Sequence, residues 1–223
     1  MVGLRHPHVR GLGMTAQRNR KRLVDRLYEE GIRDDRVLKA IGTVQRHRFV
    51  DEALANMAYR DTALPIGHGQ TISQPLIVAR MTEALLEPGP FDTVLEVGTG
   101  SGYQAAVLAE IVDQVLTVER IRPLYQRAGR LLRELGYHNV RLRQSDGSWG
   151  WPQLGPFERI VVTAGGEQIP DALREQLAPD GVLVMPVGPS GRQELIRLTR
   201  HGQDWERESL GLVSFVPLVS DKI

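Results

Sequence analysis

The strongest sign of chemistry in this chain of 223 residues is a glycine-rich turn between an apolar segment and a helix-like segment. The mainly apolar residues 94–97 run directly into three alternate glycines, Gly98, Gly100 and Gly102. Without Cβ atoms, such a turn can adopt unusual backbone dihedrals and approach a ligand, while free N–H groups at the helix start face that ligand. The turn therefore predicts a site for a nucleotide-like cofactor at the end of a strand.

The spacing of the turn bears on which cofactor it holds. The dinucleotide fingerprint, Gly-x-Gly-x-x-Gly, would put its third glycine where this chain has Tyr103. That bulky side chain, and Glu96 just before the turn, disfavour a cofactor with a pyrophosphate, which the acid would repel. The pattern suits a cofactor with a cationic or amino end, and S-adenosylmethionine is the common one.

Two acidic residues stand at the ends of the next two predicted strands. Glu119 follows the turn by about 20 residues, where a carboxylate can accept hydrogen bonds from both hydroxyls of a ribose. Asp146, followed by Gly147, could accept from the exocyclic amine of adenine. The alternatives are a surface acid at position 119 and an Asx turn at position 146. Taken with the turn, the two acids predict an adenosyl pocket.

The methyl acceptor is a separate question. The chain has no cysteine, which excludes cytosine C5 methylation, and residues 163–166 (Thr-Ala-Gly-Gly) lack the Asn/Asp-Pro-Pro-aromatic motif of enzymes that methylate exposed base amines. The six histidines show no paired ligand spacing, so we expect no metal. A carboxylate acceptor, with a pKa of about 4, is already ionised and needs positioning rather than proton abstraction. The hydroxyl of Ser73 and nearby helix-start N–H groups could orient such an anion.

The elements that must position these residues alternate along the second half of the chain. Residues 63–74 read as a shaped loop, and Ser73 as the N-cap of the helix that follows it. Expected helices cover residues 15–30, a segment after Asp34 or Asp35, the segment from 75 to before Pro88, and 104–109, 123–135 and 170–177. Expected strands cover residues 94–97, 114–119, 140–142, 160–163, 182–187, 195–199 and 205–219. This order predicts an α/β fold: a doubly wound, mostly parallel Rossmann-like methyltransferase sheet with an antiparallel C-terminal strand and an N-terminal helical addition.

Length and composition limit the other possibilities. We expect a flexible extension at residues 1–13 and a single domain at 14–223, made of a helical part with a substrate loop (14–90) and a Rossmann-like core (91–223). The net charge of +1 gives no footprint for nucleic acid, and no run of about 18 apolar residues could span a bilayer. We expect a cytoplasmic monomer with neither a nucleic-acid nor a membrane partner.

Several blocks of this sequence closely resemble the protein-L-isoaspartate O-methyltransferase family over residues 15–218. The most telling block is Gly-Gln-Thr-Ile-Ser-Gln-Pro at residues 69–75. Other matching blocks lie at residues 49–51, 64–67, 95–103, 118–121, 146–147, 169–170, 185–188 and 215–218. The resemblance implies methyl transfer from S-adenosylmethionine to the free α-carboxylate of L-isoaspartyl residues in damaged proteins and peptides, followed by closure to a succinimide.

The resemblance also implies roles for individual residues. Ser73 matches the serine taken as the active-site residue of the family. The residues implied to bind the cofactor are Gln70, Thr71, Ile72, Ser73, Glu96, Gly98, Gly100, Ser101, Gly102, Glu119, Arg120, Asp146 and Gly147. The chain departs from the family at residues 158–159 and 163–166, and at Val219, where animal members carry a threonine that contacts the cofactor.

Two other functions remain open from the residues alone. A small-molecule O-methyltransferase would need a base to ionise a phenol, and His68 in the loop could serve. A non-catalytic module that binds the cofactor and acts through partners would show binding without turnover.

Overall fold

The computed structural model describes residues 8–219. Its helices are α1 (His8–Glu29), α2 (Asp35–Thr43), α3 (Pro75–Leu86), α4 (Tyr103–Ala109), α5 (Arg122–Glu134) and α6 (Asp171–Glu175), with short 3₁₀ helices η1 (Arg46–Phe49), η2 (Glu52–Leu54), η3 (Gly147–Trp149) and η4 (Pro152–Leu154). Its strands are β1 (Leu64–Gly67), β2 (Gln70–Ile72), β3 (Thr93–Val97), β4 (Gln114–Glu119), β5 (Val140–Gln144), β6 (Phe157–Val162), β7 (Leu177–Val187), β8 (Gln193–His201) and β9 (Asp204–Val213).

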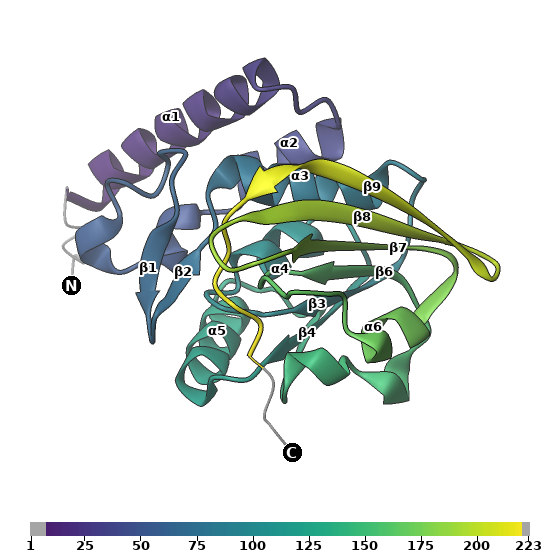
Figure 1. The fold of residues 1–223 in the computed structure, drawn as a ribbon. Coiled ribbons are helices and arrows are strands. Elements are labelled where there is room, and N and C mark those ends of the chain that lie inside the picture. The colour runs from purple at the N-terminus through teal and green to yellow at the C-terminus, as the bar shows by residue number, and fades with distance from the viewer. Residues whose placement is uncertain (1–7, 220–223) are drawn as a thin grey trace.

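Seven of the strands form one sheet in the order β5-β4-β3-β6-β7-β8-β9 (Figure 1). The pairs from β5 to β7 are parallel, and β8 and β9 add an antiparallel hairpin at the far edge. The predicted fold class is thus confirmed, with the last strand at the outer edge. Because the parallel strands all end at the same side of the sheet, the segments after β3, β4, β5 and β6 meet there.

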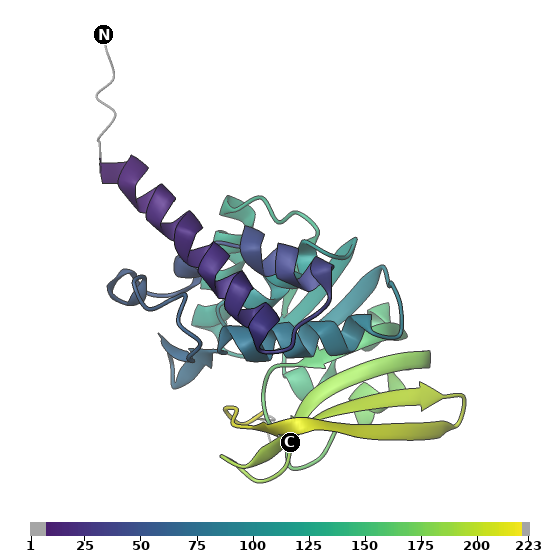
Figure 2. The same ribbon diagram turned by 90° about the horizontal axis from the view of Figure 1, so that it is seen from above.

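Side chains of the sheet alternate between two hydrophobic clusters. Val94 and Val115 point to the first cluster, which α1 to α5 complete, whereas Leu95 and Leu116 point to the second, which α6 covers. Figure 2 shows α1 and α2 on one side of the molecule, with α3 between them and strand β7 of the sheet. The first cluster joins the N-terminal helices to the sheet, which supports the proposal of a single domain.

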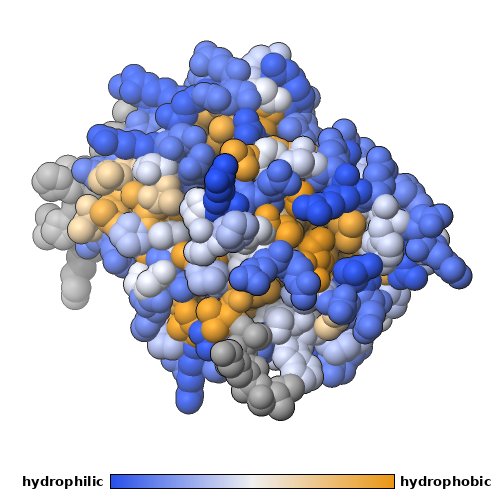
Figure 3. All heavy atoms as spheres, viewed as in Figure 1, coloured by the Kyte–Doolittle hydropathy of each residue, from blue (hydrophilic) through white to orange (hydrophobic). Residues whose placement is uncertain are grey.

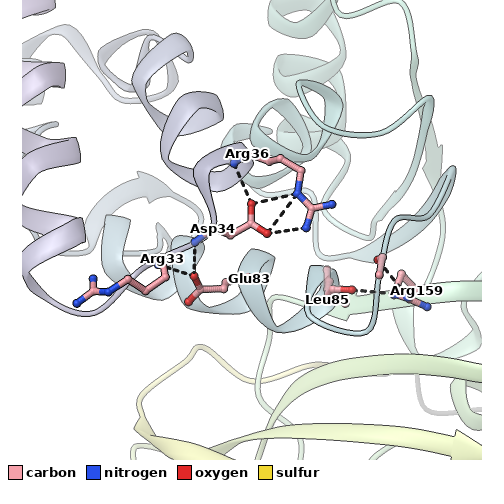
Figure 4. A network of polar contacts seen from close by, with 7 residues as sticks. Arg33, Asp34, Arg36, Glu83, Leu85 and Arg159 are labelled. Atoms are coloured by element: carbon pink, nitrogen blue, oxygen red, sulfur yellow. Dashed lines mark hydrogen bonds and ion pairs between the residues drawn. The ribbon is translucent and has the colours of Figure 1, made fainter.

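Two long-range contacts fasten α3 to its neighbours (Figure 4). The Glu83 carboxylate accepts from the backbone N–H groups of Arg33 at 2.7 Å and Asp34 at 2.8 Å, just before α2. Asp34 itself is the N-cap of α2, as one of the two predicted candidates. In the same last turn of α3, Arg159 of β6 donates from Nε to the carbonyl of Leu85 at 2.7 Å. The helix that follows Ser73 is therefore fixed to both the helical layer and the sheet.

Some boundaries differ from the prediction. Helix α1 begins at His8, so it includes residues 8–13 of the predicted extension, while residues 1–7 lie outside the described part. The segment expected as a loop at 63–74 contains the hairpin β1–β2, whose turn has positive φ at His68 (54°) and Gly69 (68°). Both turn residues in the left-handed region are typical of a tight two-residue hairpin. The last strand ends at Val213 rather than near residue 219.

Candidate active site

The glycine turn follows β3 and leads into α4. Gly98, Gly100 and Gly102 have φ angles of 99°, 53° and 88°, a region that side chains disfavour. At Gly98 a Cβ atom would also lie 2.6 Å from Thr163 Oγ1. The turn is anchored to the next strand, because the N–H of Gly98 donates to the carbonyl of Val118 at 2.9 Å. Glycine is therefore required both by the dihedrals and by the close approach of β6.

Glu119 stands across from this turn at the end of β4. One carboxylate oxygen accepts from the N–H of Gly100 at 2.8 Å, and the other accepts from the N–H of Ile121 at 2.8 Å. The side chain is nearly buried, at 6% exposed. Two backbone donors thus hold the carboxylate in place at the edge of the crevice.

A cavity opens between the turn, Glu119 and the β1–β2 hairpin. Ten of the predicted site residues line it, namely Gln70, Thr71, Ile72, Ser73, Gly98, Gly100, Ser101, Glu119, Arg120 and Gly147. A Cβ atom at Gly147 would come within 2.5 Å of Val97 Cγ1, so a larger residue would displace this wall. The structure thus brings together segments that follow β2, β3, β4 and β5.

Further wall residues had no signal in the local pattern. They are Val78, Val97, Thr99, Tyr103, Gln104, Val118, Ile121, Thr163, Ala164 and residues 216–219. The C-terminal segment reaches the cavity because the Gly165 N–H donates to the Val216 carbonyl at 2.8 Å and the Leu218 N–H donates to the Gly165 carbonyl at 2.7 Å. The sequence signals for this segment were its resemblance to the family block at 215–218 and the position of Val219, where animal members of the family carry a threonine that contacts the cofactor.

Three predicted residues, Glu96, Gly102 and Asp146, do not line the cavity. Gly102 is the N-cap of α4. The Asp146 carboxylate accepts from the N–H of Ser148 at 2.8 Å and from its hydroxyl at 2.7 Å. This is the Asx-type cap of its own loop, the alternative that the sequence had left open.

Glu96 lies beneath the turn and is fully buried. Thr117 Oγ1 donates to its carboxyl at 2.5 Å, and Thr117 in turn contacts the hydroxyl of Thr99 at 2.6 Å. Burial raises the pKa of Glu96 to about 8, with Glu119 adding to the rise. The carboxyl is therefore protonated at neutral pH. Through Thr117 it connects to Thr99 in the glycine turn, and it does not face the cavity.

Ser73 follows the hairpin and precedes α3. The prediction that it caps this helix is wrong, since the N-cap is Gln74 and the free N–H of Leu76 donates to Asp61 Oδ1 at 2.8 Å. The Ser73 carbonyl accepts from Arg46 Nη2 at 2.7 Å. Because its backbone is held by these contacts, the serine side chain is not needed for capping and is half-exposed at the cavity.

A second cavity adjoins the first, and both are lined by Thr71, Ser73, Thr163 and Val216. Its other wall residues are Ala63, Gln74, Ile77, Gly191, Arg192, Leu212, Val213, Ser214 and Phe215. Leu212 is 73% exposed, and Arg192 is exposed as well. The face drawn in Figure 3 carries several separate apolar patches between charged side chains. The second cavity thus offers a mixed apolar and cationic surface next to Ser73.

Other candidate features lie apart from the two cavities. His68 is exposed in the hairpin turn and belongs to neither wall, which argues against the base of a phenol methyltransferase. Over residues 8–219, His, Asp and Glu form no group of three or more that could hold a metal ion. No helix in the same range is both long enough and apolar enough to cross a bilayer.

Comparison with known proteins identifies one family. The model of the family "Protein-L-isoaspartate(D-aspartate) O-methyltransferase (PCMT)" matches residues 17–223. The chain is 53% identical over 220 residues to the protein-L-isoaspartate O-methyltransferase of Halorhodospira halophila, covering 99% of this chain and 100% of that protein. It is 56% identical over 207 residues to the enzyme of Ectopseudomonas mendocina, covering 93% of this chain and 98% of that one.

Solved structures agree with this result. A protein-L-isoaspartate O-methyltransferase superimposes with a TM-score of 0.83 at 27% identity, covering 90% of this chain and 66% of that chain. A beta-aspartate methyltransferase from Plasmodium falciparum, in complex with S-adenosyl-L-homocysteine, superimposes with a TM-score of 0.80 at 26% identity, covering 91% of this chain and 99% of that chain.

Proposed function

The chain belongs to the protein-L-isoaspartate(D-aspartate) O-methyltransferase family, and from this premise we propose that Ser73 orients the acceptor carboxylate beside the adenosyl cofactor. The protein transfers a methyl group from S-adenosylmethionine to the α-carboxylate of L-isoaspartyl residues, which initiates repair through a succinimide. The observation that supports the role of Ser73 is its position in the wall shared by the two cavities.

The first cavity suits an adenosyl cofactor. The Glu119 carboxylate is held by two backbone N–H groups and is placed to accept from ribose hydroxyls, while the glycine turn lets the backbone approach the amino-acid end. When bound, S-adenosylmethionine supplies a sulfonium methyl group as the electrophile. Gly147 leaves room beside Val97 for the base, and we propose that the Asp146 carboxylate, whose Oδ1 accepts from Ser148, also accepts from the exocyclic amine of adenine.

The acceptor needs orientation and little else. An isoaspartyl α-carboxylate is ionised at neutral pH, so no base and no metal is required to create the nucleophile. A hydroxyl donor at Ser73 can fix one oxygen of the carboxylate and leave the other directed at the methyl group. Holding the reacting atoms near contact and in line removes several kcal/mol from the barrier by orientation alone.

The polypeptide on either side of the isoaspartyl residue fits the second cavity. This cavity reaches Ser73 at one end, and Phe215 and the exposed Leu212 supply apolar contacts at its rim. Arg192 adds a positive charge to the same wall. We propose that substrate segments lie here, with the isoaspartyl carboxylate directed past Ser73 into the first cavity.

The test uses two peptides that differ only in aspartyl versus isoaspartyl linkage, incubated with S-adenosylmethionine carrying a labelled methyl group. We expect label on the isoaspartyl peptide alone, as a base-labile ester. Equal labelling of both peptides, or label on neither while S-adenosylhomocysteine binds in calorimetry, would contradict the proposed acceptor.

A further inference from the structure

Arg46 is a fully buried cation that lies between the N-terminal helical part of the chain and the segment around Ser73. Its side chain is 0% exposed at the start of η1, and burial lowers the pKa of its guanidinium. Its Nε donates to the carbonyl of Ala58 at 2.8 Å, and its Nη2 donates to the carbonyl of Ser73 at 2.7 Å. Removing a charge from water is costly, and neutral carbonyls offset that cost only in part. A buried cation with this incomplete compensation suggests that Arg46 has a role besides stabilising the fold.

The bond to Ser73 is one of two that fix the path of the acceptor segment. Arg46 holds the carbonyl of Ser73, and the Asp61 carboxylate holds the N–H of Leu76 at 2.8 Å. Only two residues lie between these anchor points, and the second of them is the proline that begins α3. The direction of the Cα–Cβ bond of Ser73 therefore depends on the anchors of this backbone segment.

The other side of the guanidinium contacts the cofactor wall. It lies 4.7 Å from the ring centroid of Tyr103, which is the first residue of α4 after the glycine turn and lines the first cavity. Phe49 supports the same ring from its edge, with centroids 5.6 Å apart. A planar cation over an aromatic face gives a defined spacing as well as attraction. One side chain thus touches both walls of the site.

We propose that Arg46 is a positioning residue for methyl transfer, which sets the distance and orientation of Ser73 relative to the turn that holds the cofactor. The proposal rests on the role of Ser73 proposed above. Arg46 does not contact the substrate in this role. It acts by setting the position of the Ser73 segment relative to the glycine turn. A misplacement on the order of 1 Å is enough to slow an oriented reaction about 100-fold.

The chain contains a matched control for this residue. Arg159 is also buried, at 6% exposed, donates through Nε to the Leu85 carbonyl at 2.7 Å, and lies 5.0 Å from the ring centroid of Phe91. Its contacts join β6 to the far end of α3, and it lines neither cavity. Substituting either arginine removes a buried cation bound to carbonyls and an aromatic ring, but only Arg46 touches Ser73.

The experiment compares Arg46→Lys with Arg159→Lys in the full chain, using thermal unfolding, calorimetry with S-adenosylhomocysteine, and kcat on an isoaspartyl peptide. Lysine keeps the charge and loses the planar fork. We expect both variants to lose stability. Only Arg46→Lys should lose kcat, by about tenfold or more, with the affinity for S-adenosylhomocysteine within about threefold of the parent.

A double-mutant cycle isolates the route through Ser73. If Arg46 acts by placing that side chain, Arg46→Lys should change kcat by less than about twofold in a Ser73→Ala background. Additive losses would overturn the proposal. So would equal losses of kcat in the Arg46 and Arg159 variants, or a loss of cofactor affinity as large as the loss of kcat.

Two controls separate the possible failures. Should Arg46→Lys not fold, Arg46→Gln paired with Arg159→Gln applies the same criteria without burying a charge. An unsubstituted protein that failed to methylate the isoaspartyl peptide would refute the proposed function itself. A parent enzyme that is active and a Ser73→Ala variant with unchanged kcat would remove the premise on which the role of Arg46 rests.

Discussion

The two walls of the methyl-transfer site are held in place by different means. The cofactor wall is built from main chain: strand ladders, the glycine turn bonded to Val118, and the Glu119 carboxylate fixed by backbone donors. The acceptor wall around Ser73 is held by side chains, because Arg46 binds the carbonyl of Ser73 and Asp61 binds the N–H of Leu76.

This difference suggests how each wall responds to change. A parallel sheet has many ladder bonds, so its geometry depends on no single side chain, but its turn tolerates no added atoms at the crowded glycines. The acceptor wall has a two-strand hairpin of only four and three residues, and a hairpin of that size is marginal without support. We therefore expect steric changes to disable the cofactor wall, and loss of polar groups to disable the acceptor wall.

The largest effect should come from a single methyl group on the cofactor wall. Gly98→Ala combines a positive φ with a contact of 2.6 Å to Thr163 Oγ1, so the affinity for S-adenosylhomocysteine should fall about 100-fold or more. Gly136→Ala is the control, since that glycine has a φ of 85° but nothing within 4 Å of its Cβ position. It should cost only about 1 kcal/mol of stability. Similar calorimetric affinities in both variants would show that the turn does not define the cofactor wall.

A smaller effect is expected from the acceptor wall when the Ser73 hydroxyl is removed. A hydrogen bond to a charged group contributes roughly 2 kcal/mol, so Ser73→Ala should lower kcat about 30-fold. The melting temperature and the affinity for S-adenosylhomocysteine should hardly change, because Gln74 is the N-cap of α3. Ser214→Ala, in the second cavity only, is the control for a lost hydroxyl. A change in melting temperature with normal turnover would instead make Ser73 a structural residue.

The same contrast explains what could be predicted from the sequence. The cofactor wall could be predicted from local sequence patterns. Apolar runs predicted β3 and β4, the alternate glycines predicted the turn, and the position of Glu119 at the end of a strand indicated a binding role. The order of β8 and β9 at the edge of the sheet could not be predicted from the sequence, because either strand of an antiparallel hairpin can pair with β7. The loop cap made by Asp146, whose carboxylate accepts from Ser148, was one of the two roles that the sequence left open, and its role toward adenine stays a prediction.

The acceptor wall could not be derived from local pattern. Its anchors act over separations of 27 residues, from Arg46 to Ser73, and 15 residues, from Asp61 to Leu76. The sequence predicted Ser73 as an N-cap because serine shortly before a proline-initiated helix is a common start signal. In the structure the N–H of Leu76, in the first turn of that helix, donates instead to the carboxylate of Asp61. Residue types alone indicated Ser73 as a hydroxyl that could orient an anion, and the resemblance to a family added the block around it, but neither indicated the anchors on its backbone.

A third prediction tests the support under the cofactor wall. Glu96, with a pKa raised to about 8 from an ordinary 4.5, binds a proton in the folded state that the unfolded chain releases. Its contribution to stability is fully present below pH 4.5 and is lost as the pH rises toward 8. Between pH 6 and 7.5 this amounts to about 2 kcal/mol. Glu96→Gln should flatten that part of the stability profile, as measured by denaturant unfolding, whereas Glu83→Gln, at a half-buried position of α3 away from the turn, should keep the slope.

The smallest expected effect concerns the surface that receives the polypeptide. Arg192 is an exposed charge on the wall of the second cavity, so Arg192→Glu should raise KM about threefold for isoaspartyl peptides with acidic neighbours and lower it for basic ones. Neutral peptides should be unaffected, and Arg130→Glu on α5 is the charge-matched control. Because screened surface charges weaken in salt, the difference should vanish near 1 M salt. An effect on kcat, or one equal in the Arg130 variant, would mean that Arg192 does not contact the substrate chain and that the second cavity meets the peptide through its apolar rim alone.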